Sequence, residues 1–90
     1  MARVLAVIRV FPSGTEVDVE DLASRLGKSL PKECALAKFE VEEIGFGIKV
    51  LRVYVLMPED YEGGTARIEE AFSSVDGVSQ VEVEYVTRVS

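Results

Sequence analysis

The stretch FEVEEIGFGIKVLRVYV, residues 39–55, contains the pattern that decides the fold. Apolar and polar residues alternate on both sides of the Gly-Phe-Gly triplet at residues 45–47, and this alternation has the period of a β-strand. Two such segments joined by a short, glycine-containing connection predict a β-hairpin. The expected strands cover residues 34–44 and 48–57.

Outside this hairpin, two segments have the period of an amphipathic helix. Residues 18–30 carry one apolar stripe, with Asp18 placed to cap the first turn and Pro31 placed to end the helix. Residues 65–75 repeat the pattern and are followed by Gly77, which is typical of a helix C-terminus. Both segments are therefore predicted to pack against a sheet through one apolar face.

Residues 3–11 and 78–89 alternate as strands do, so the predicted order is β-α-β-β-α-β. Two right-handed β-α-β units interleave into a four-stranded antiparallel sheet with both helices on one face. We therefore predict an α+β, ferredoxin-like βαββαβ sandwich that forms a single domain over residues 1–90. The helix side of the sheet is expected to carry Val4, Ala6, Ile8, Val10, Phe39, Val41, Leu51, Val53 and Val55. On the last strand, the side chains expected to face away from Gln80, Glu82 and Glu84 are Val81, Val83 and Tyr85.

The side of the sheet that no helix covers is predicted to be unusually apolar. An exposed apolar patch of this kind usually marks a contact site. The patch would suit a protein-binding domain, and the alternative is a small regulatory or ligand-binding domain that dimerises through this open face. The residues expected there are Leu5, Val7, Ile48, Val50, Tyr54 and Leu56.

The composition disfavours a nucleic acid or a membrane as the partner. The net charge is −6, whereas binding to phosphate backbones depends on clustered Lys and Arg. RNA-recognition domains share the βαββαβ order, but their central strands carry several stacking aromatics, and here Tyr54 stands alone. No apolar run approaches the ~20 residues that span a bilayer. The lone Cys34 cannot form an intrachain disulfide, which suits a reducing, cytoplasmic location.

Residues that would support catalysis are scarce. The chain has no His, which removes the commonest general base and metal ligand, and Cys34 therefore has no His to activate it. No phosphate-binding loop of the GxxxxGK[ST] type occurs. We predict that the protein is not an enzyme and that it binds neither a cofactor nor a metal of its own.

The hairpin tip is the feature that the core does not explain. Phe46 lies between Gly45 and Gly47, so its ring gains little from the domain's own interior. It either folds back over the edge of the sheet from a bulged turn or is offered to a pocket on a partner, as an interface anchor would be.

The string Ile44-Gly45-Phe46-Gly47-Ile48-Lys49, followed by Leu51, resembles the signature hairpin of the elongation factor 1-beta exchange-domain family in its short archaeal form. Other features are similar along essentially the whole chain. They are the strand that runs into Pro12 before an acidic helix, Glu-Gly-Gly-Thr at 62–65, Asp-Gly-Val at 76–78 and Val-Thr-Arg at 86–88.

The resemblance implies a guanine nucleotide exchange factor that binds the GDP-bound GTPase elongation factor 1-alpha and promotes GDP release in translation. In this family the hairpin Phe, here Phe46, contacts the GTPase, and a basic residue near the C-terminus approaches its Mg²⁺ and phosphate site. Eukaryotic members have Lys there, whereas the matching residue here is Arg88, a planar fork in place of a point charge. We also expect contacts from Gly45, Gly47, Ile48 and Lys49, and a wider footprint through Tyr54 and its open-face neighbours.

Overall fold

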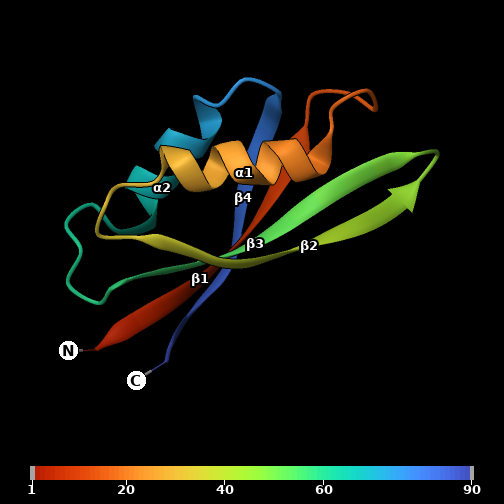
Figure 1. Ribbon diagram of the computed structural model, residues 1–90. Coiled ribbons are helices and arrows are strands. Elements are labelled where there is room, and N and C mark those ends of the chain that lie inside the picture. The colour runs from red at the N-terminus through yellow and green to blue at the C-terminus, as the bar shows by residue number, and fades with distance from the viewer. Residues whose placement is uncertain (1, 90) are drawn as a thin grey trace.

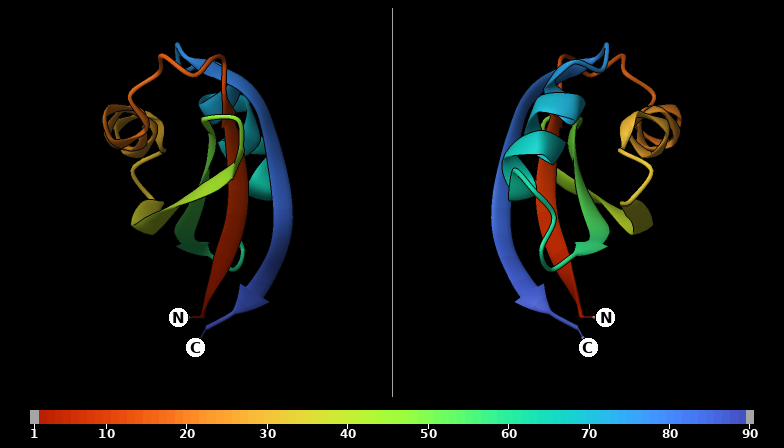
Figure 2. Two further views of the ribbon diagram at one scale, coloured as in Figure 1. Left: turned by 90° about the vertical axis from the view of Figure 1, so that its right-hand side faces the viewer. Right: turned by 90° about the vertical axis from the view of Figure 1, so that its left-hand side faces the viewer.

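The computed structural model describes residues 2–89 and confirms the ferredoxin-like α+β fold in the order βαββαβ (Figure 1). The sheet is antiparallel with the strand order β2-β3-β1-β4, so β1 and β3 are central and β2 and β4 are edges. Both helices pack on one face of this sheet, and Figure 2 shows α1 end-on. The elements are β1 (Arg3–Pro12), α1 (Val19–Ser29), β2 (Ala35–Gly45), β3 (Ile48–Pro58), α2 (Gly64–Ser73) and β4 (Val78–Arg88).

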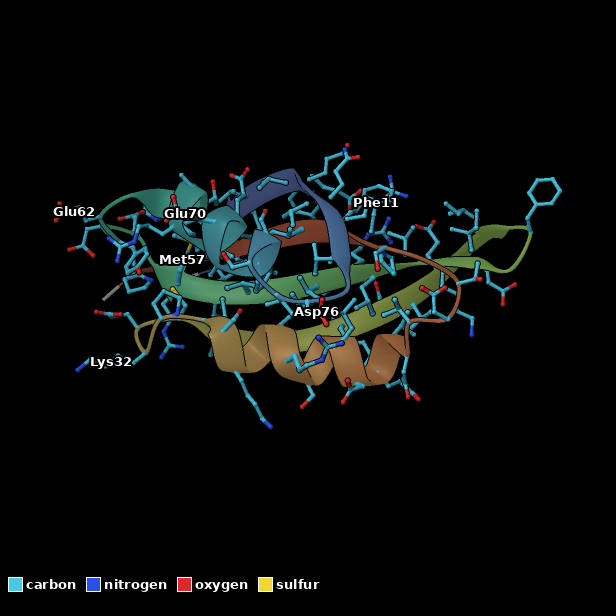
Figure 3. The ribbon with its side chains drawn as sticks, turned by 90° about the horizontal axis from the view of Figure 1, so that it is seen from above. Phe11, Lys32, Met57, Glu62, Glu70 and Asp76 are labelled. Carbon is cyan, nitrogen blue, oxygen red and sulfur yellow. The ribbon has the colours of Figure 1, made fainter. Side chains whose placement is uncertain are left out.

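The hydrophobic core lies between the helices and the central strands. On the helix side of β1 and β3, the predicted residues are buried, apart from Val4, which is half-buried and packs against the core. Met57 lies in the same layer, between the sheet and the helices (Figure 3). The buried residues of this core are Ala6, Ile8, Val10, Val19, Leu22, Ala23, Leu26, Cys34, Leu51, Val53, Val55, Met57, Ile68 and Phe72.

Phe39 and Val41 lie on the predicted side of the sheet but are not part of this core. They pair with Val53 and Leu51 and so share the helix side of the sheet, yet they remain 39% and 43% exposed. Their strand β2 is an edge strand, and the outer part of the β2–β3 hairpin extends beyond the end of α1 (Figure 1). No helix therefore covers these two side chains.

Helix α1 begins and ends where its sequence signals indicate. The Asp18 carboxylate accepts hydrogen bonds from the backbone N–H groups of Glu20 (3.0 Å) and Asp21 (3.2 Å), which satisfies donors that have no partner within the helix. At the other end, Leu30 is already extended, with ψ of 145°, as the residue before Pro31 should be.

Helix α2 ends two residues earlier than predicted. Its last residue is Ser73, and Val75 lies in the turn that follows, still packed against the core. Gly77 takes a positive φ of 97° in that turn, and its carbonyl accepts a hydrogen bond from the Ser13 N–H at 2.8 Å. Gly77 thus shapes the entry into β4 and is not adjacent to the helix end.

The open face of the sheet is not the apolar patch that the sequence predicted. Val7 and Val50 face this side but have no exposed surface, and Leu5, Tyr54 and Leu56 are half-buried. Of the predicted apolar set, Ile48 alone is exposed, at 43%. Charged side chains cover the middle of the face, through the ion pairs Arg9–Glu42 (3.5 Å), Arg9–Glu82 (4.0 Å), Arg52–Glu42 (3.6 Å) and Arg52–Glu84 (2.7 Å).

A β-bulge changes the alternation along β4. Val7 pairs with Tyr85 and Ile8 pairs with Val83, so Glu84 is an extra residue in the ladder. Tyr85 is consequently placed opposite Val7 on the open face and is 54% exposed, so the expectation that it shares one face with Val81 and Val83 is wrong. The sequence pattern could not locate this extra residue.

Candidate protein-binding site

The predicted partner-binding residues of the hairpin lie together at one tip of the molecule. Gly45 ends β2 and pairs with Ile48, the first residue of β3, so that Phe46 and Gly47 form a two-residue turn. All three residues of the Gly-Phe-Gly triplet have positive φ, of 110°, 56° and 75° in order. Positive φ at both central turn residues matches the right-handed twist of a hairpin, and Lys49 follows directly on β3.

Phe46 projects away from the protein and is fully exposed. The alternative in which its ring folds back over the sheet edge is therefore wrong. Left-handed backbone is unfavourable for a bulky residue, by roughly 1–2 kcal/mol. Phe46 thus has a strained backbone conformation, and its apolar ring is fully exposed to solvent. No contact within its own domain compensates for either cost.

An open groove of about 520 Å³ lies beside this tip on the helix side. One wall is the loop between β1 and α1, including Thr15 and Val17, and the other wall is the hairpin. Val41, Gly47 and Lys49 contribute the hairpin wall, so two of the predicted site residues line a concave surface next to Phe46.

Arg88 lies at the opposite end of the sheet, as the last residue of β4. It pairs with Val4, whose other partner is Met57 near the end of β3. Its guanidinium binds the Glu59 carboxylate through two contacts, Nε to Oε2 at 2.7 Å and Nη2 to Oε1 at 3.0 Å. The Arg88 side chain is nevertheless 67% exposed.

The full length of β3 therefore separates the two predicted contact points. This strand has 11 residues, from Ile48 beside the hairpin tip to Pro58 beside the Arg88 end. At a rise of about 3.3 Å per residue, the two ends are roughly 33 Å apart. The longest dimension of the molecule is 42 Å, so Phe46 and Arg88 mark its two extremities.

Tyr54 lies between these ends, in the middle of β3 on the open face. Its hydroxyl donates a hydrogen bond to Glu40 at 2.8 Å, and the Lys38 ammonium lies 4.5 Å from the centre of its ring. The hydrogen bond to Glu40, followed by desolvation, raises the pKa of Tyr54 above its ordinary value. Tyr54 is thus engaged within its own sheet and not free to stack on a base.

The single cysteine lies in surroundings that do not activate its thiol. Burial, with a smaller contribution from Glu33, raises the pKa of the Cys34 thiol, which keeps it in the unreactive form. Within residues 2–89, no three His, Cys, Asp or Glu side chains are grouped so that they could hold a metal ion. No helix in the same part of the chain is both long and apolar enough to cross a membrane.

Sequence reasoning missed Glu59 and Glu40, which bind the side chains of Arg88 and Tyr54. Glu59 is 29 residues from Arg88 in the chain, and Glu40 is 14 residues from Tyr54. No local pattern signals such pairs, because they depend on which strand ends adjoin and on the strand register. The register Lys38↔Tyr54 in the β2–β3 pair would have been needed to find Glu40.

This ferredoxin-like domain, with an exposed aromatic at one extremity and an exposed cation at the other, has the features of a protein-binding domain. The sequence matches the model of the EF-1 guanine nucleotide exchange domain over residues 5–89. The chain therefore belongs to the EF-1 guanine nucleotide exchange domain family.

Relatives of similar length support this assignment. Proteins named elongation factor 1-beta from Desulfurococcus amylolyticus and Staphylothermus marinus are 47% and 43% identical over 90 residues, with 100% of both chains covered in each case. The protein of the same name from Metallosphaera sedula is 48% identical over 89 residues, which cover 99% of this chain and 98% of that one. The chain is a translation factor that performs guanine nucleotide exchange in elongation, and it is not an enzyme.

Proposed function

We propose that the partner of this chain is the GDP-bound form of elongation factor 1-alpha, and that a single exchange domain contacts this GTPase at two separate sites. Phe46 supplies the contact at the hairpin tip, together with its neighbours Gly45, Gly47, Ile48 and Lys49. Arg88 supplies the contact at the other extremity, close to the Mg²⁺ and phosphates of the bound nucleotide. We further propose that the complex forms in the cytoplasm.

The observation that carries this proposal is the complete exposure of Phe46 in a strained turn. An aromatic side chain has few rotatable bonds and so loses little conformational freedom when it enters a pocket, and aromatic residues dominate many interfaces. The approach to the ring is open on both sides, since even a Cβ added at Gly45 or Gly47 would meet nothing within 4 Å.

The charge on Arg88 suits the proposed action on the nucleotide site. A bound Mg²⁺ is the largest local charge at a diphosphate, so a cation that displaces it or attracts its ligands weakens the hold on GDP. The partner-binding energy from the hairpin end, roughly 33 Å away, supplies the work for this intrusion. By linkage, the exchange protein lowers the affinity of the GTPase for GDP, and GDP lowers the affinity of the GTPase for the exchange protein by the same ratio.

The alternatives considered from the sequence lose their structural basis. The dimerising regulatory domain required an exposed apolar open face, whereas ion pairs cover the middle of that face. The RNA-binding alternative required free cations and aromatics, but acidic side chains engage Arg9 and Arg52, and Tyr54 binds Glu40. Among the open-face residues, Val7 and Val50 are too buried to touch a partner, and Tyr54 stays a predicted contact.

The test is release of a fluorescent GDP analogue from elongation factor 1-alpha of the same organism. We expect the wild-type chain to accelerate release, and Phe46→Ala and Arg88→Ala to lose most of that acceleration. Phe46→Ala should raise the concentration needed for half-maximal effect, whereas Arg88→Ala should lower the maximal rate. Tyr54→Ala should weaken complex formation if Tyr54 widens the footprint.

Two matched variants control for non-specific effects. Phe39→Ala removes another exposed phenylalanine of the same hairpin, and Arg3→Ala removes another exposed cation from the Arg88 end of the sheet. Both should retain most of the exchange activity. No acceleration by the wild-type chain on a GTPase that binds GDP normally would refute the partner assignment.

A further inference from the structure

The carboxylate of Glu59 meets Arg88 along one particular edge of the guanidinium. The contacts are Nε to Oε2 at 2.7 Å and Nη2 to Oε1 at 3.0 Å, which form a side-on bidentate pair. Arginine has donors on a second edge, between Nη1 and Nη2, that can bind another oxyanion at the same time. The side-on pair therefore fixes the plane of the guanidinium and leaves its end available.

The backbone on both sides of this pair is anchored to the start of β1. The Glu59 N–H donates to the carbonyl of Ala2 at 3.2 Å, and the Val89 N–H donates to the carbonyl of Arg3 at 3.0 Å. Chain ends and loops are ordinarily the least fixed parts of a domain. Here the backbone of Glu59, and that of Val89 next to Arg88, are hydrogen-bonded to adjacent residues at the start of β1. The ion pair therefore joins two fixed backbone positions.

The loop that carries Glu59 is further organised by its own turns. The Tyr61 N–H donates to the Pro58 carbonyl at 3.1 Å, and the Gly64 N–H donates to the Tyr61 carbonyl at 3.0 Å. Glu62 lies in the same loop, at the end of the molecule away from the hairpin tip (Figure 3). Glu59 is thus presented by an ordered loop, and a neighbouring carboxylate of equal charge is available for comparison.

We propose that Glu59 is a positioning residue for Arg88. It holds the guanidinium by the Nε–Nη2 edge so that the Nη1–Nη2 edge faces the GTPase, where it binds an oxyanion of the nucleotide site, either a phosphate or an Mg²⁺-ligating carboxylate. Two carboxylate or phosphate groups then occupy two edges of one guanidinium. This inference rests on the role of Arg88 in the proposed function.

The pairing also gives a reason for arginine at this position. Lysine is a point charge without a second rigid edge, and it cannot be oriented by one carboxylate while it presents a planar face to another anion. The long, flexible arginine side chain would otherwise sample many rotamers and lose them on binding. Glu59 removes that freedom before the partner arrives.

The decisive experiment is a double-mutant cycle read by GDP release at saturating factor. Glu59→Gln keeps the size of the side chain but replaces one acceptor oxygen with an amide that opposes the guanidinium N–H groups. We expect it to lower the maximal release rate about fivefold, as the loss of about 1 kcal/mol of positioning would. The concentration for half-maximal effect should change less than about twofold, because Phe46 supplies that contact.

The same substitution in an Arg88→Ala background should have no further effect, since there is then no guanidinium to position. Glu62→Gln makes the same charge change in the same loop and should match the wild-type chain. An unfolding curve of each variant shows whether it remains folded. An equal loss from Glu59→Gln in both backgrounds, or no loss in either, would overturn the positioning role.

The outcomes separate this inference from the function on which it rests. If the wild-type chain does not accelerate GDP release, the partner assignment fails. If it does but Arg88→Ala is as active as the wild type, the assigned role of Arg88 fails, and the positioning role fails with it. If Arg88→Ala is impaired and Glu59→Gln is not, the positioning role alone is refuted.

Discussion

Arg52 on β3 and Glu84 on β4 form a 2.7 Å ion pair across β1, the strand that lies between them. Glu84 can reach because it is the extra residue of the β4 bulge, opposite Val7 and Ile8. The pair crosses the open face where Val7 would otherwise be exposed. The hydrogen bond to Glu84 also raises the pKa of Arg52, which stays charged throughout the accessible range.

We expect Arg52→Ala to lower the thermal unfolding midpoint, because it removes the ion-pair partner of Glu84, one of the two partners of Glu42, and the side chain that covers Val7. Part of the loss is electrostatic, so the difference from the wild type should shrink in about 1 M salt, where the screening length falls to about 3 Å. Differential scanning calorimetry at low and high salt measures this. A difference that is independent of salt would assign the effect to packing alone.

The hydrogen bond from Tyr54 to Glu40 predicts how stability changes at alkaline pH. The folded-state pKa of Tyr54 is raised above its ordinary value of 10.0, so the folded chain retains a proton that the unfolded chain loses. The stabilisation is complete below pH 10 and declines as the pH rises through the folded-state pKa. Urea unfolding between pH 8 and 11 should show a steeper decline for the wild type than for Tyr54→Phe.

Phe46→Asn should make the free protein more stable and less active. Asparagine tolerates left-handed backbone, and Asn-Gly is the preferred pair for this two-residue turn, so we expect a gain of about 1 kcal/mol in the free energy of unfolding. Phe46→Ala is the matched control, because it removes the ring without relieving the backbone. Both variants should lose exchange activity, and an Asn variant no more stable than the Ala variant would contradict the strain argument.

The two glycines Gly47 and Gly27 should respond in opposite ways to alanine. At Gly47, φ is 75° and there is open space for a Cβ, so the cost of about 1–2 kcal/mol is purely conformational. At Gly27, inside α1, a Cβ would make ordinary contacts of 3.8 Å and 3.9 Å with Leu36, so alanine should stabilise by roughly 0.5–1 kcal/mol. Chemical denaturation should show a lower free energy of unfolding for Gly47→Ala and a higher one for Gly27→Ala than for the wild type.

Cys34 should be slow to react while the protein is folded. Its thiol is buried and its pKa is raised, so the reactive thiolate is scarce at neutral pH. Modification by a thiol reagent at pH 7 should therefore be much faster in denaturant than in buffer. Equal rates under the two conditions would mean that the loop around Cys34 opens readily.

The elements could be predicted because they depend on local periodicity. Each helix and strand is 10 or 11 residues long and follows from a pattern within that length. Asp18 caps the start of the first helix and Pro31 sets its end, and both act on near neighbours in the chain. Phe46 could be singled out because it interrupts the pattern, although the sequence left open whether its ring folded back.

What the sequence could not show depends on register across the sheet. The bulge at Glu84 reverses the expected face of Tyr85, and only the three-dimensional register brings Arg52 to Glu84 and Arg88 to Glu59. Counting apolar residues on the open face overestimated its exposure because it ignored side chains that reach across from neighbouring strands. Likewise, Phe39 and Val41 alternate as helix-side residues should, but they lie in the part of the hairpin that extends beyond the helices and so remain exposed.

The two ends of the described chain lie side by side, since Val4 on β1 pairs with Arg88 on β4 and the ends of these two strands adjoin in Figures 1 and 2. A short linker could therefore join them, and a circularly permuted chain opened at the exposed turn around Ser13 would keep the whole sheet intact. In the unpermuted chain, any tag or fused domain at either terminus projects beside Arg88. Permutation would leave the Arg88 end clear, but it would place that added mass on the loop that lines the groove beside Phe46.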